Sequence, residues 1–290
     1  MKRVITIWWV LLFLFSKCFA QASPGARQIA LAHADVSSSN DVFALFNNPA
    51  GLSFLKSREA GLFYSPAPFD VKELSNTYAA YCEPTSFGSF GAGFGIYGFE
   101  LYKETKITIG YGKKISNIFF AGLTSVYHNV SIKNYGSKGV LIFNLGAIAK
   151  LNDQIGFGFV IENISRSTFA NESNQIPSVL WLGTDLNLVK EISFTAAIRK
   201  EIGFNPSIRL GTEYSIIDFL KLRIGVSNEP NTYSGGLGIL YDFVQADYAV
   251  SSHSDLGLTH QFGLIIRFTN KQNNKGLKSR LMQARGLKHK

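Results

Sequence analysis

The run Gly93-Phe94-Gly95-Ile96-Tyr97-Gly98 contains the G-x-G-x-x-G pattern of dinucleotide-binding proteins. Cofactor binding by this pattern requires a turn between a strand and a helix, because the pyrophosphate sits on the helix N-terminus. Here the glycines alternate with apolar residues inside one extended run, so we predict a strand with a bare inner face. Such glycines let another segment approach the wall or let the strand bend. We therefore predict no cofactor.

A second cluster of reactive residue types lies near the C-terminus. Serines, histidines and an aspartate of the kinds used in a serine–histidine active site or a metal site follow one another there: Ser251, Ser252, His253, Ser254, Asp255 and His260. Their spacing carries no motif that brings a nucleophile, a base and an orienting group together. A polar loop is the simpler interpretation, so we predict no catalytic residue, no metal ligand and no enzyme.

A third run, Asn48-Pro49-Ala50-Gly51, lies within the apolar residues 44–52. Asn, Pro and Gly make this stretch too broken for a core helix or strand, yet it is too apolar for a simple linker. Its role therefore depends on the elements that follow it.

From about residue 59 onward the chain alternates apolar residues with polar or small ones, which is the pattern of strands with two different faces. Between residues 207 and 216 one face carries Ile208, Leu210, Tyr214 and Ile216, and the other carries Ser207, Arg209, Gly211, Glu213 and Ser215. A soluble β-sandwich also alternates, so the pattern alone does not decide the architecture.

The number and length of these runs favour a membrane barrel. Many are about ten residues long, as a tilted strand needs to be in order to cross a bilayer. Fourteen can be placed, an even number as in single-chain bacterial barrels: 59–64, 74–83, 88–99, 103–114, 118–129, 139–151, 154–163, 178–188, 191–200, 206–216, 220–227, 233–241, 243–251 and 256–268. We predict an all-β protein, a 14-stranded antiparallel transmembrane β-barrel in the bacterial outer membrane, in contact with outer-membrane lipid.

The lengths of the connections between these strands also favour a membrane barrel. Every second one is short, as at Asn152-Asp153 and Asp242, whereas the others include the longer stretches 65–73, 130–138, 164–177 and 201–205. Outer-membrane barrels have short periplasmic turns and longer external loops. We therefore predict that residues 164–177 are external and that Asn152-Asp153 is periplasmic.

If the apolar face of each strand meets lipid, the polar face points into the lumen, and a set of charged side chains lies on that inner face. The turn at residues 217–219 places Glu213 opposite Arg223, as a cross-strand pair of opposite charge. The same inward face holds Glu162, Asp185, Arg209, Asp247 and Arg267. Mixed charges and many glycines predict a hydrated or plugged interior.

Both ends of the chain differ from the body. Residues 1–22 have a charged start and an apolar stretch too short to span a bilayer, so we predict a signal peptide cleaved after Ala20 or Ala22. Cleavage would leave Cys82 without a partner for a disulfide. Three basic residues lie in this signal and seven follow Phe268 without an acid, so the +9 charge leaves the body nearly neutral. We expect no nucleic-acid partner.

The domain boundaries follow from these features. We predict a signal peptide over 1–22, an N-terminal plug over 23–57, the barrel over 58–269 and a basic periplasmic tail over 270–290. The plug would lie at the periplasmic mouth or inside the lumen, with small residues forming a short helix, Asp41 capping a second one and Asn48-Pro49 ending it.

The order "GAR…AL…A…S…D…ALF-NPAGL" resembles the N-terminus of the FadL and PorV/PorQ-like outer-membrane proteins, whose Asn-Pro-Ala motif matches Asn48, Pro49 and Ala50. The end, with residues 245–249 followed by 256–260, is similar to the "DYA…LG-TH" ending of the PorV/PorQ branch. The resemblance implies fourteen strands with the N-terminal segment folded into the barrel.

Members of this superfamily are passive transporters of hydrophobic molecules or non-enzymatic partners of the type IX secretion apparatus. The short external loops and the basic tail favour an accessory or docking subunit of a secretion or assembly machine, in complex with other envelope proteins. The alternative is a passive FadL-like transporter that takes a hydrophobic ligand.

Overall fold

The computed structural model describes residues 23–169 and 176–268, and within them fourteen strands, two α-helices and three 3-10 helices. The strands are β1 Arg58–Ser65, β2 Asn76–Thr85, β3 Gly88–Gly98, β4 Tyr102–Lys114, β5 Phe119–Ile132, β6 Gly136–Lys150, β7 Ile155–Glu162, β8 Val179–Asn187, β9 Ile192–Glu201, β10 Ser207–Ile217, β11 Leu220–Asn228, β12 Asn231–Tyr241, β13 Val244–His253 and β14 Gly257–Phe268. The helices are α2 Ala26–Ala30, α3 Ala44–Asn47, η2 Pro49–Phe54, η3 Pro68–Asp70 and η4 Lys72–Leu74. The predicted signal peptide, the predicted tail and residues 170–175 of the predicted loop 164–177 lie outside the described residues.

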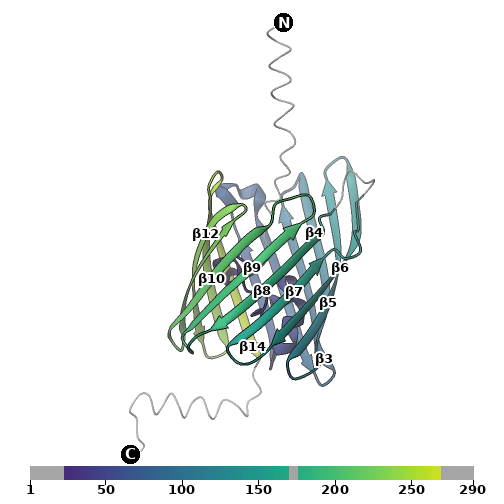
Figure 1. The fold of residues 1–290 in the computed structure, drawn as a ribbon. Helices are drawn as coiled ribbons and strands as arrows, with labels where there is room; N and C mark the ends of the chain where they lie inside the picture. Colours follow the sequence, from purple (N-terminus) through teal and green to yellow (C-terminus); the bar gives the residue numbers. More distant parts are fainter. Residues whose placement is uncertain (1–22, 170–175, 269–290) are drawn as a thin grey trace, which may run out of the picture.

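The strands form one closed antiparallel barrel (Figure 1). Each strand pairs with its neighbours in sequence, and β1 closes the ring by pairing with β14, with Arg58 opposite Phe268 and Tyr64 opposite Phe262. Closure leaves the barrel without a first or last free edge. The predicted all-β, 14-stranded antiparallel barrel is therefore confirmed.

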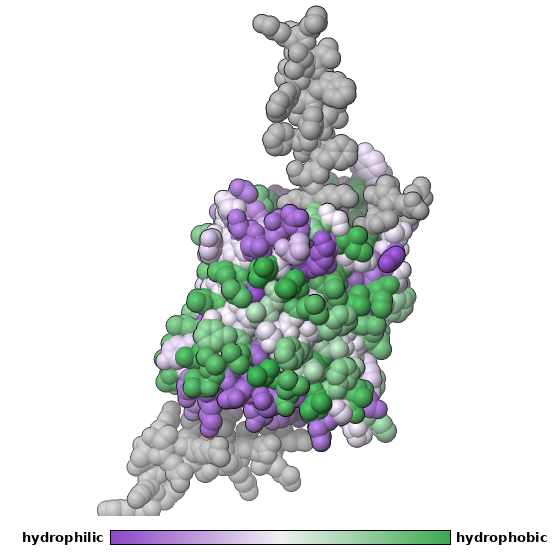
Figure 2. All heavy atoms as spheres, in the orientation of Figure 1, coloured by the Kyte–Doolittle hydropathy of each residue, from purple (hydrophilic) through white to green (hydrophobic). Residues whose placement is uncertain are grey.

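Alternation along the strands produces two different walls. On the outside, Ile224, Phe194 and Leu222 are 65%, 41% and 43% exposed, whereas inward Arg223 and Thr195 are buried. Figure 2 shows hydrophobic side chains over the middle of the visible face and hydrophilic ones toward the two ends. This apolar belt is the surface that lipid chains would cover.

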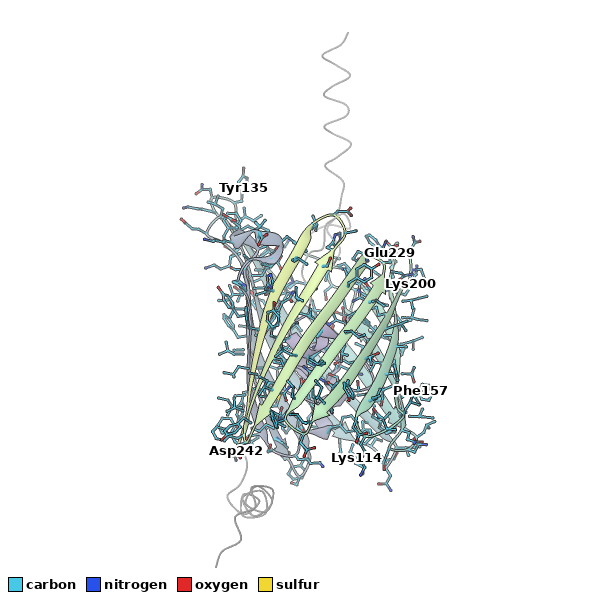
Figure 3. All side chains as sticks on the ribbon, turned by 90° about the vertical axis from the view of Figure 1, so that its left-hand side faces the viewer. Lys114, Tyr135, Phe157, Lys200, Glu229 and Asp242 are labelled. Atoms are coloured by element: carbon cyan, nitrogen blue, oxygen red, sulfur yellow. The ribbon has the colours of Figure 1, made fainter. Side chains whose placement is uncertain are left out.

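Figure 3 places Tyr135, Lys200 and Glu229 at one end of the barrel, the upper end, and Lys114 and Asp242 at the other, the lower end. The sequence predicts that the upper end is external and the lower end periplasmic.

The predicted asymmetry of the connections is weaker than expected. The predicted loop 130–138 is wrong, because β5 and β6 stay paired up to Ile132 and Gly136 and leave only residues 133–135 as a turn. Above the membrane a strand needs no apolar face, so alternation fades while backbone pairing continues. Among the seven upper connections of the described chain, only 66–75 and 163–178 are long.

The segment before β1 lies inside the ring of strands, where Figure 1 shows it in purple. Helix α2 contacts β11 to β14, whereas η2 contacts β2 to β6. Ser23 and Pro24 share a cavity with Tyr135 of the upper end, and β1 begins beside Phe268 at the end of β14. The segment therefore runs down through the lumen. None of the helices in the described ranges is long and apolar enough to cross a membrane.

Candidate functional site

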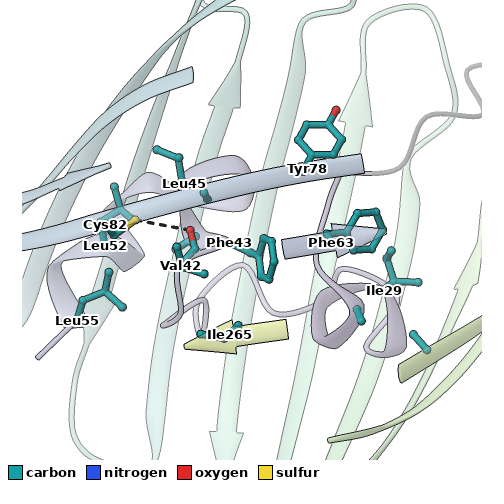
Figure 4. Close-up of a cluster of buried hydrophobic side chains, with 14 of the residues drawn as sticks. Ile29, Val42, Phe43, Leu45, Leu52, Leu55, Phe63, Tyr78, Cys82 and Ile265 are labelled. Carbon is teal, nitrogen blue, oxygen red and sulfur yellow. Dashed lines mark hydrogen bonds between the residues drawn. The ribbon is translucent and has the colours of Figure 1, made fainter. Parts of the chain in front are cut away.

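One face of the N-terminal segment is apolar and packs against the wall near β1, β2 and β14. Figure 4 shows this cluster, and its fully buried large members include Phe43, Leu45, Leu52, Phe63 and Ile265. The ring centroids of Phe43 and Phe63 lie 6.5 Å apart in an edge-to-face arrangement. The apolar character of residues 42–55, unexpected in a linker, is thus explained by burial.

The Asn48-Pro49-Ala50-Gly51 motif joins the two halves of the segment and touches the wall. Asn48 ends α3 and caps η2, because its Oδ1 accepts a hydrogen bond from Ala50 N at 3.1 Å, while its Nδ2 donates to Val36 O at 2.7 Å. Gly51 admits the neighbouring chain, since a Cβ there would lie 2.1 Å from Ser39 O. The motif therefore fixes a sharp, buried turn.

Glycines of the barrel wall accommodate this segment. A Cβ on Gly93 would lie 2.5 Å from the Phe46 ring, and one on Gly122 would lie 2.3 Å from the Pro49 carbonyl carbon. Real side chains do not approach so closely, so bare backbone is needed at these positions. The G-x-G-x-x-G run thus lies within β3, where Gly93 admits a side chain of the N-terminal segment.

The opposite face of the segment is held by charges. Glu213 and Arg223 are register partners, with Arg223 Nε donating to Glu213 Oε2 at 2.7 Å. Arg27 of α2 reaches the same oxygen at 3.3 Å, and Arg223 also donates to Asp247 at 2.6 Å. These buried groups form one connected network between the segment and β10, β11 and β13.

The remaining lumen charges are distributed around the wall. Arg209 donates to Ala32 O at 3.0 Å, and its guanidinium lies 5.1 Å from the centre of the Trp181 ring. Asp185 pairs with Lys150 at 2.7 Å near β6 and β8. The structure therefore brings Glu213, Arg223 and Asp247 together but places Arg209, Asp185 and Glu162 elsewhere.

Several participants are missed by sequence reasoning. Arg27 lies in the predicted plug, and nothing in its local pattern indicates a partner in β10. Asp41, which the sequence predicts as a cap, accepts from Phe43 N at 2.9 Å, whereas its hydrogen bond from Gln28 Nε2 at 3.0 Å, which ties the turn to α2, is not predicted. Glu59 of β1 accepts from Arg267 of β14 at 3.0 Å. The alternation along β1 could have predicted that Glu59 faces the lumen. The contact of Arg27 with β10 depends on long-range packing and could not be predicted.

Two titratable groups of the segment, His33 and Asp35, lie outside the membrane-spanning strands and have shifted pKa values. Burial, reinforced by the nearby Arg209 charge, lowers the pKa of His33 to about 3, so the imidazole is neutral at pH 7. Burial raises the pKa of Asp35 to about 6, although Arg27, 3.8 Å away, favours the carboxylate. Neither His33 Nε2 nor Asp35 Oδ2 has a hydrogen-bond partner within the described part of the chain.

Above the segment lies a cavity of about 1080 Å³ that extends toward the upper end. Its size is at the top of the range of small-molecule sites. Much of its lining is apolar or aromatic: Leu45, Phe46, Tyr78, Tyr97, Tyr102, Val126, Val130, Ile132, Tyr135, Ile142, Phe169, Ile176, Pro177 and Val179. Leu45 and Phe46 belong to the N-terminal segment, which therefore supplies part of the wall.

A smaller number of charged groups lines the same cavity. Glu104 accepts from Tyr102 Oη at 2.8 Å, and its other oxygen lies 2.8 Å from His128 Nε2. The Phe169 ring meets His128 edge to face, with centroids 5.0 Å apart. Lys106 and Lys138 line the cavity as well, so its wall combines apolar and aromatic surface with many polar groups.

A second polar group belongs to β7, β8 and β9. Glu162 accepts from Trp181 Nε1 at 2.9 Å, and Arg199 donates to Glu201 Oε2 at 2.7 Å. Val179 lies between the two carboxylates in the strand register. Sequence parity identifies Glu162, whereas Glu201 comes directly after the predicted strand 191–200.

The residues near the C-terminus do not assemble a catalytic site. His260 Nδ1 is hydrogen-bonded to Tyr248 Oη at 2.7 Å, and His253 Nδ1 accepts from Asp255 N. Ser251 Oγ is hydrogen-bonded to the Gln261 side-chain amide at 3.1 Å. Within residues 23–169 and 176–268, no group of three or more His, Cys, Asp or Glu side chains could hold a metal ion.

Comparison with known proteins gives a likeness of fold. Neither a family model nor a curated protein matches the chain. A Pseudomonas aeruginosa FadL homologue matches with a TM-score of 0.62 and 12% identity, over 86% of this chain and 99% of that one. The P. putida toluene transporter TodX matches with a TM-score of 0.64 and 14% identity, over 85% of this chain and 99% of that one. The Acinetobacter baumannii outer membrane protein Omp33 matches with a TM-score of 0.50 and 8% identity, over 73% of this chain and 98% of that one.

The fold is therefore that of the FadL- and TodX-type outer-membrane barrels, and the FadL-like part of the predicted resemblance is confirmed at the level of fold. The PorV/PorQ branch stays a prediction. The closed barrel, its apolar belt and these neighbours together place the protein in a bacterial outer membrane, as the sequence predicts.

Proposed function

We propose that this protein is a passive transporter that lets small hydrophobic molecules cross the outer membrane. The observation that carries the proposal is the cavity of about 1080 Å³, about half of whose lining residues are apolar or aromatic. The toluene transporter and the FadL homologue, which share the fold, support the same class of function. The transporter alternative of the sequence interpretation is thus preferred over the docking subunit.

In this proposal the N-terminal segment acts as a plug below the cavity. Its apolar face fixes it to β1, β2 and β14, while its polar face meets charged wall residues. Side-chain oxygens of Ser37, Ser38 and Ser39 are buried without a hydrogen-bond partner among the described residues. Buried polar groups of this kind are normally satisfied by water. We therefore expect the polar face of the segment to be hydrated.

The accessory-subunit interpretation now rests on the PorV/PorQ-like resemblance and on the basic tail. The short external loops, its other support, do not argue against a binding site inside the barrel, where the cavity lies. Gentle detergent extraction distinguishes the two functions. A docking subunit would leave the membrane in a stoichiometric complex with other envelope proteins, whereas the proposed transporter would leave alone.

Binding of labelled toluene to the purified protein tests the proposal. Val126 lines the cavity, so Val126→Trp should narrow it and weaken binding. Val226 faces outward and is 41% exposed, so Val226→Trp makes the same chemical change on the lipid face and should leave binding intact. Equal binding by both variants would show that the cavity is not the site.

A further inference from the structure

A buried asparagine lies where β7 ends. Asn163 is 1% exposed, and its backbone has a left-handed φ of 51°, a conformation that Asn adopts more readily than most residues. Its N–H donates to Asn144 Oδ1 of β6 at 2.9 Å, and its carbonyl oxygen accepts from Ser178 Oγ, just before β8, at 2.9 Å. The residue is therefore fixed to the strand and the chain segment on either side of it.

The Asn163 side chain joins the two limbs of the β7–β8 connection that the structure describes, residues 163–169 and 176–178. In the first limb, Oδ1 accepts from Ser167 N at 2.8 Å and Nδ2 donates to Ser167 O at 3.3 Å. In the second, Nδ2 donates to Ile176 O at 2.8 Å. Without this amide, buried backbone groups of both limbs would lose their partner, which is unfavourable.

Both limbs contribute apolar side chains to the wall of the cavity. Phe169, Ile176 and Pro177 line it, and the Phe169 ring meets His128 of β5 edge to face with centroids 5.0 Å apart. Phe169 lies two residues after Ser167, and Ile176 is itself bonded to Asn163. The place of these apolar groups in the wall therefore depends on the Asn163 amide.

We propose that Asn163 is a positioning residue of the cavity, which holds Phe169 and Ile176 where a hydrophobic ligand contacts them. This inference rests on the proposed transport function and names a residue that shapes its binding site. Asn163 acts through the two limbs and not through a contact of its own with the ligand. Its loss should leave the barrel intact but remove part of the apolar wall.

Asn163→Gly isolates the side chain, because glycine adopts the left-handed conformation without strain. Asn134→Gly is the matched control, since Asn134 also has a left-handed φ, 68°, and is exposed in the turn between β5 and β6. Both variants are compared with the parent as purified full-length proteins in detergent.

The first measurement is the rate at which trypsin cleaves after Arg166, which is exposed in the first limb. Cleavage requires local opening of the chain, and the hydrogen bonds of Asn163 oppose that opening. Asn163→Gly should be cleaved there about tenfold faster than the parent, the ratio that hydrogen bonds worth about 1.4 kcal/mol give. Cleavage at other sites should not change, which verifies that the barrel remains folded.

The second measurement is the Kd of labelled toluene in a double-mutant cycle. The variant Phe169→Ala/Ile176→Ala removes both side chains from the wall and should bind about fivefold more weakly than the parent, the ratio that an aromatic contact of about 1 kcal/mol gives. Asn163→Gly should weaken binding in the parent but add nothing to this variant, because residues that act through one another are not additive. Asn134→Gly should bind as the parent does.

The outcomes separate the inference from the proposed function. Equal cleavage after Arg166 in the parent and Asn163→Gly would overturn the inference while toluene binding still supports transport. Additive effects in the cycle, or an unchanged Kd in Asn163→Gly, would overturn it as well. A parent protein that binds no toluene would refute the proposed function, and with it the inference that rests on that function.

Discussion

Arg27 of the N-terminal segment and Glu213 of β10, 186 positions apart in the chain, form an ion pair at 3.3 Å inside the barrel. Glu213 is also bonded to Arg223 and Lys221, so one carboxylate joins the segment to two strands. This pair connects the proposed plug to the polar wall, and a displacement of the segment away from β10 would break it.

Arg27→Ala should loosen the segment. The Arg27 side chain is 12% exposed, and removing one partner of a buried pair costs about 3 kcal/mol. The free energy of unfolding measured in urea should fall by about that amount, and conductance in planar bilayers should rise. Arg58→Ala is the control, because the Arg58–Glu83 pair at 2.8 Å is solvent-exposed and contributes little. Equal effects of the two variants would contradict the anchoring role.

The lipid face can be tested at Leu222. Its side chain points outward from the first third of β11, so Leu222→Arg should place a charge in the hydrocarbon between the membrane edge and the midplane and cost about 1–3 kcal/mol. Phe219 lies in the turn before this strand, at the membrane edge, where Phe219→Arg should cost only about 0–1 kcal/mol. The folded fraction of each variant is measured after refolding into lipid vesicles. Normal assembly of Leu222→Arg would show that the strand parity is wrong.

Much of the barrel is predictable because its signal is local. The outward and inward faces of residues 207–216 and the pairing of Glu213 with Arg223 follow from alternation and a tight turn, and both are seen in the register. The hairpin at residues 130–138 is mispredicted because Ser131 and Ser137, though polar, are paired strand residues.

The candidate site is predictable only in part, because its members come together through long-range packing. The wall glycines signal that something approaches them, but nothing near Gly93 identifies Phe46 as the partner. The cavity depends on how far the segment fills the lumen, which no local pattern contains. Glu201 could not be identified as a cavity residue either, because a charged residue at the end of a strand has many possible roles.

The orientation of the barrel can be tested with single cysteines. Tyr135 is 89% exposed at the upper end, so Tyr135→Cys should react with an impermeant thiol reagent on intact cells. Asp153→Cys in the lower turn should react only after the outer membrane is opened. Asn171, in the predicted external loop, lies outside the described residues, and Asn171→Cys should label as Tyr135→Cys does. The buried Cys82 gives the parent no background. The reverse labelling pattern would invert the predicted topology.

Acidification should change the stability of the fold through His33 and through Asp35 in opposite directions. The folded pKa of His33, about 3, lies below its ordinary 6.5, so between these values the unfolded chain binds more protons and acidification destabilises the fold. The folded pKa of Asp35, about 6, lies above its ordinary 3.8, so acidification across that window stabilises it. The two effects offset each other between about pH 4 and 6.

Variants separate these two groups. Between pH 7 and pH 4.5, Asp35→Asn should lose more thermal stability than the parent, because only the His33 effect remains. His33→Gln should lose less. The midpoint temperature of unfolding, measured at both pH values, checks this, and the same pH dependence in all three proteins would contradict the assignment.

The central claim, passive transport through the cavity, is tested most directly by the entry of labelled toluene into intact cells with a tight outer membrane. Cells that carry the parent protein or Val226→Trp should take up toluene faster than cells without the protein, and cells with Val126→Trp should take it up more slowly than cells with the parent. An uptake rate that is the same with and without the parent protein, at confirmed levels of folded barrel in the outer membrane, would contradict the account.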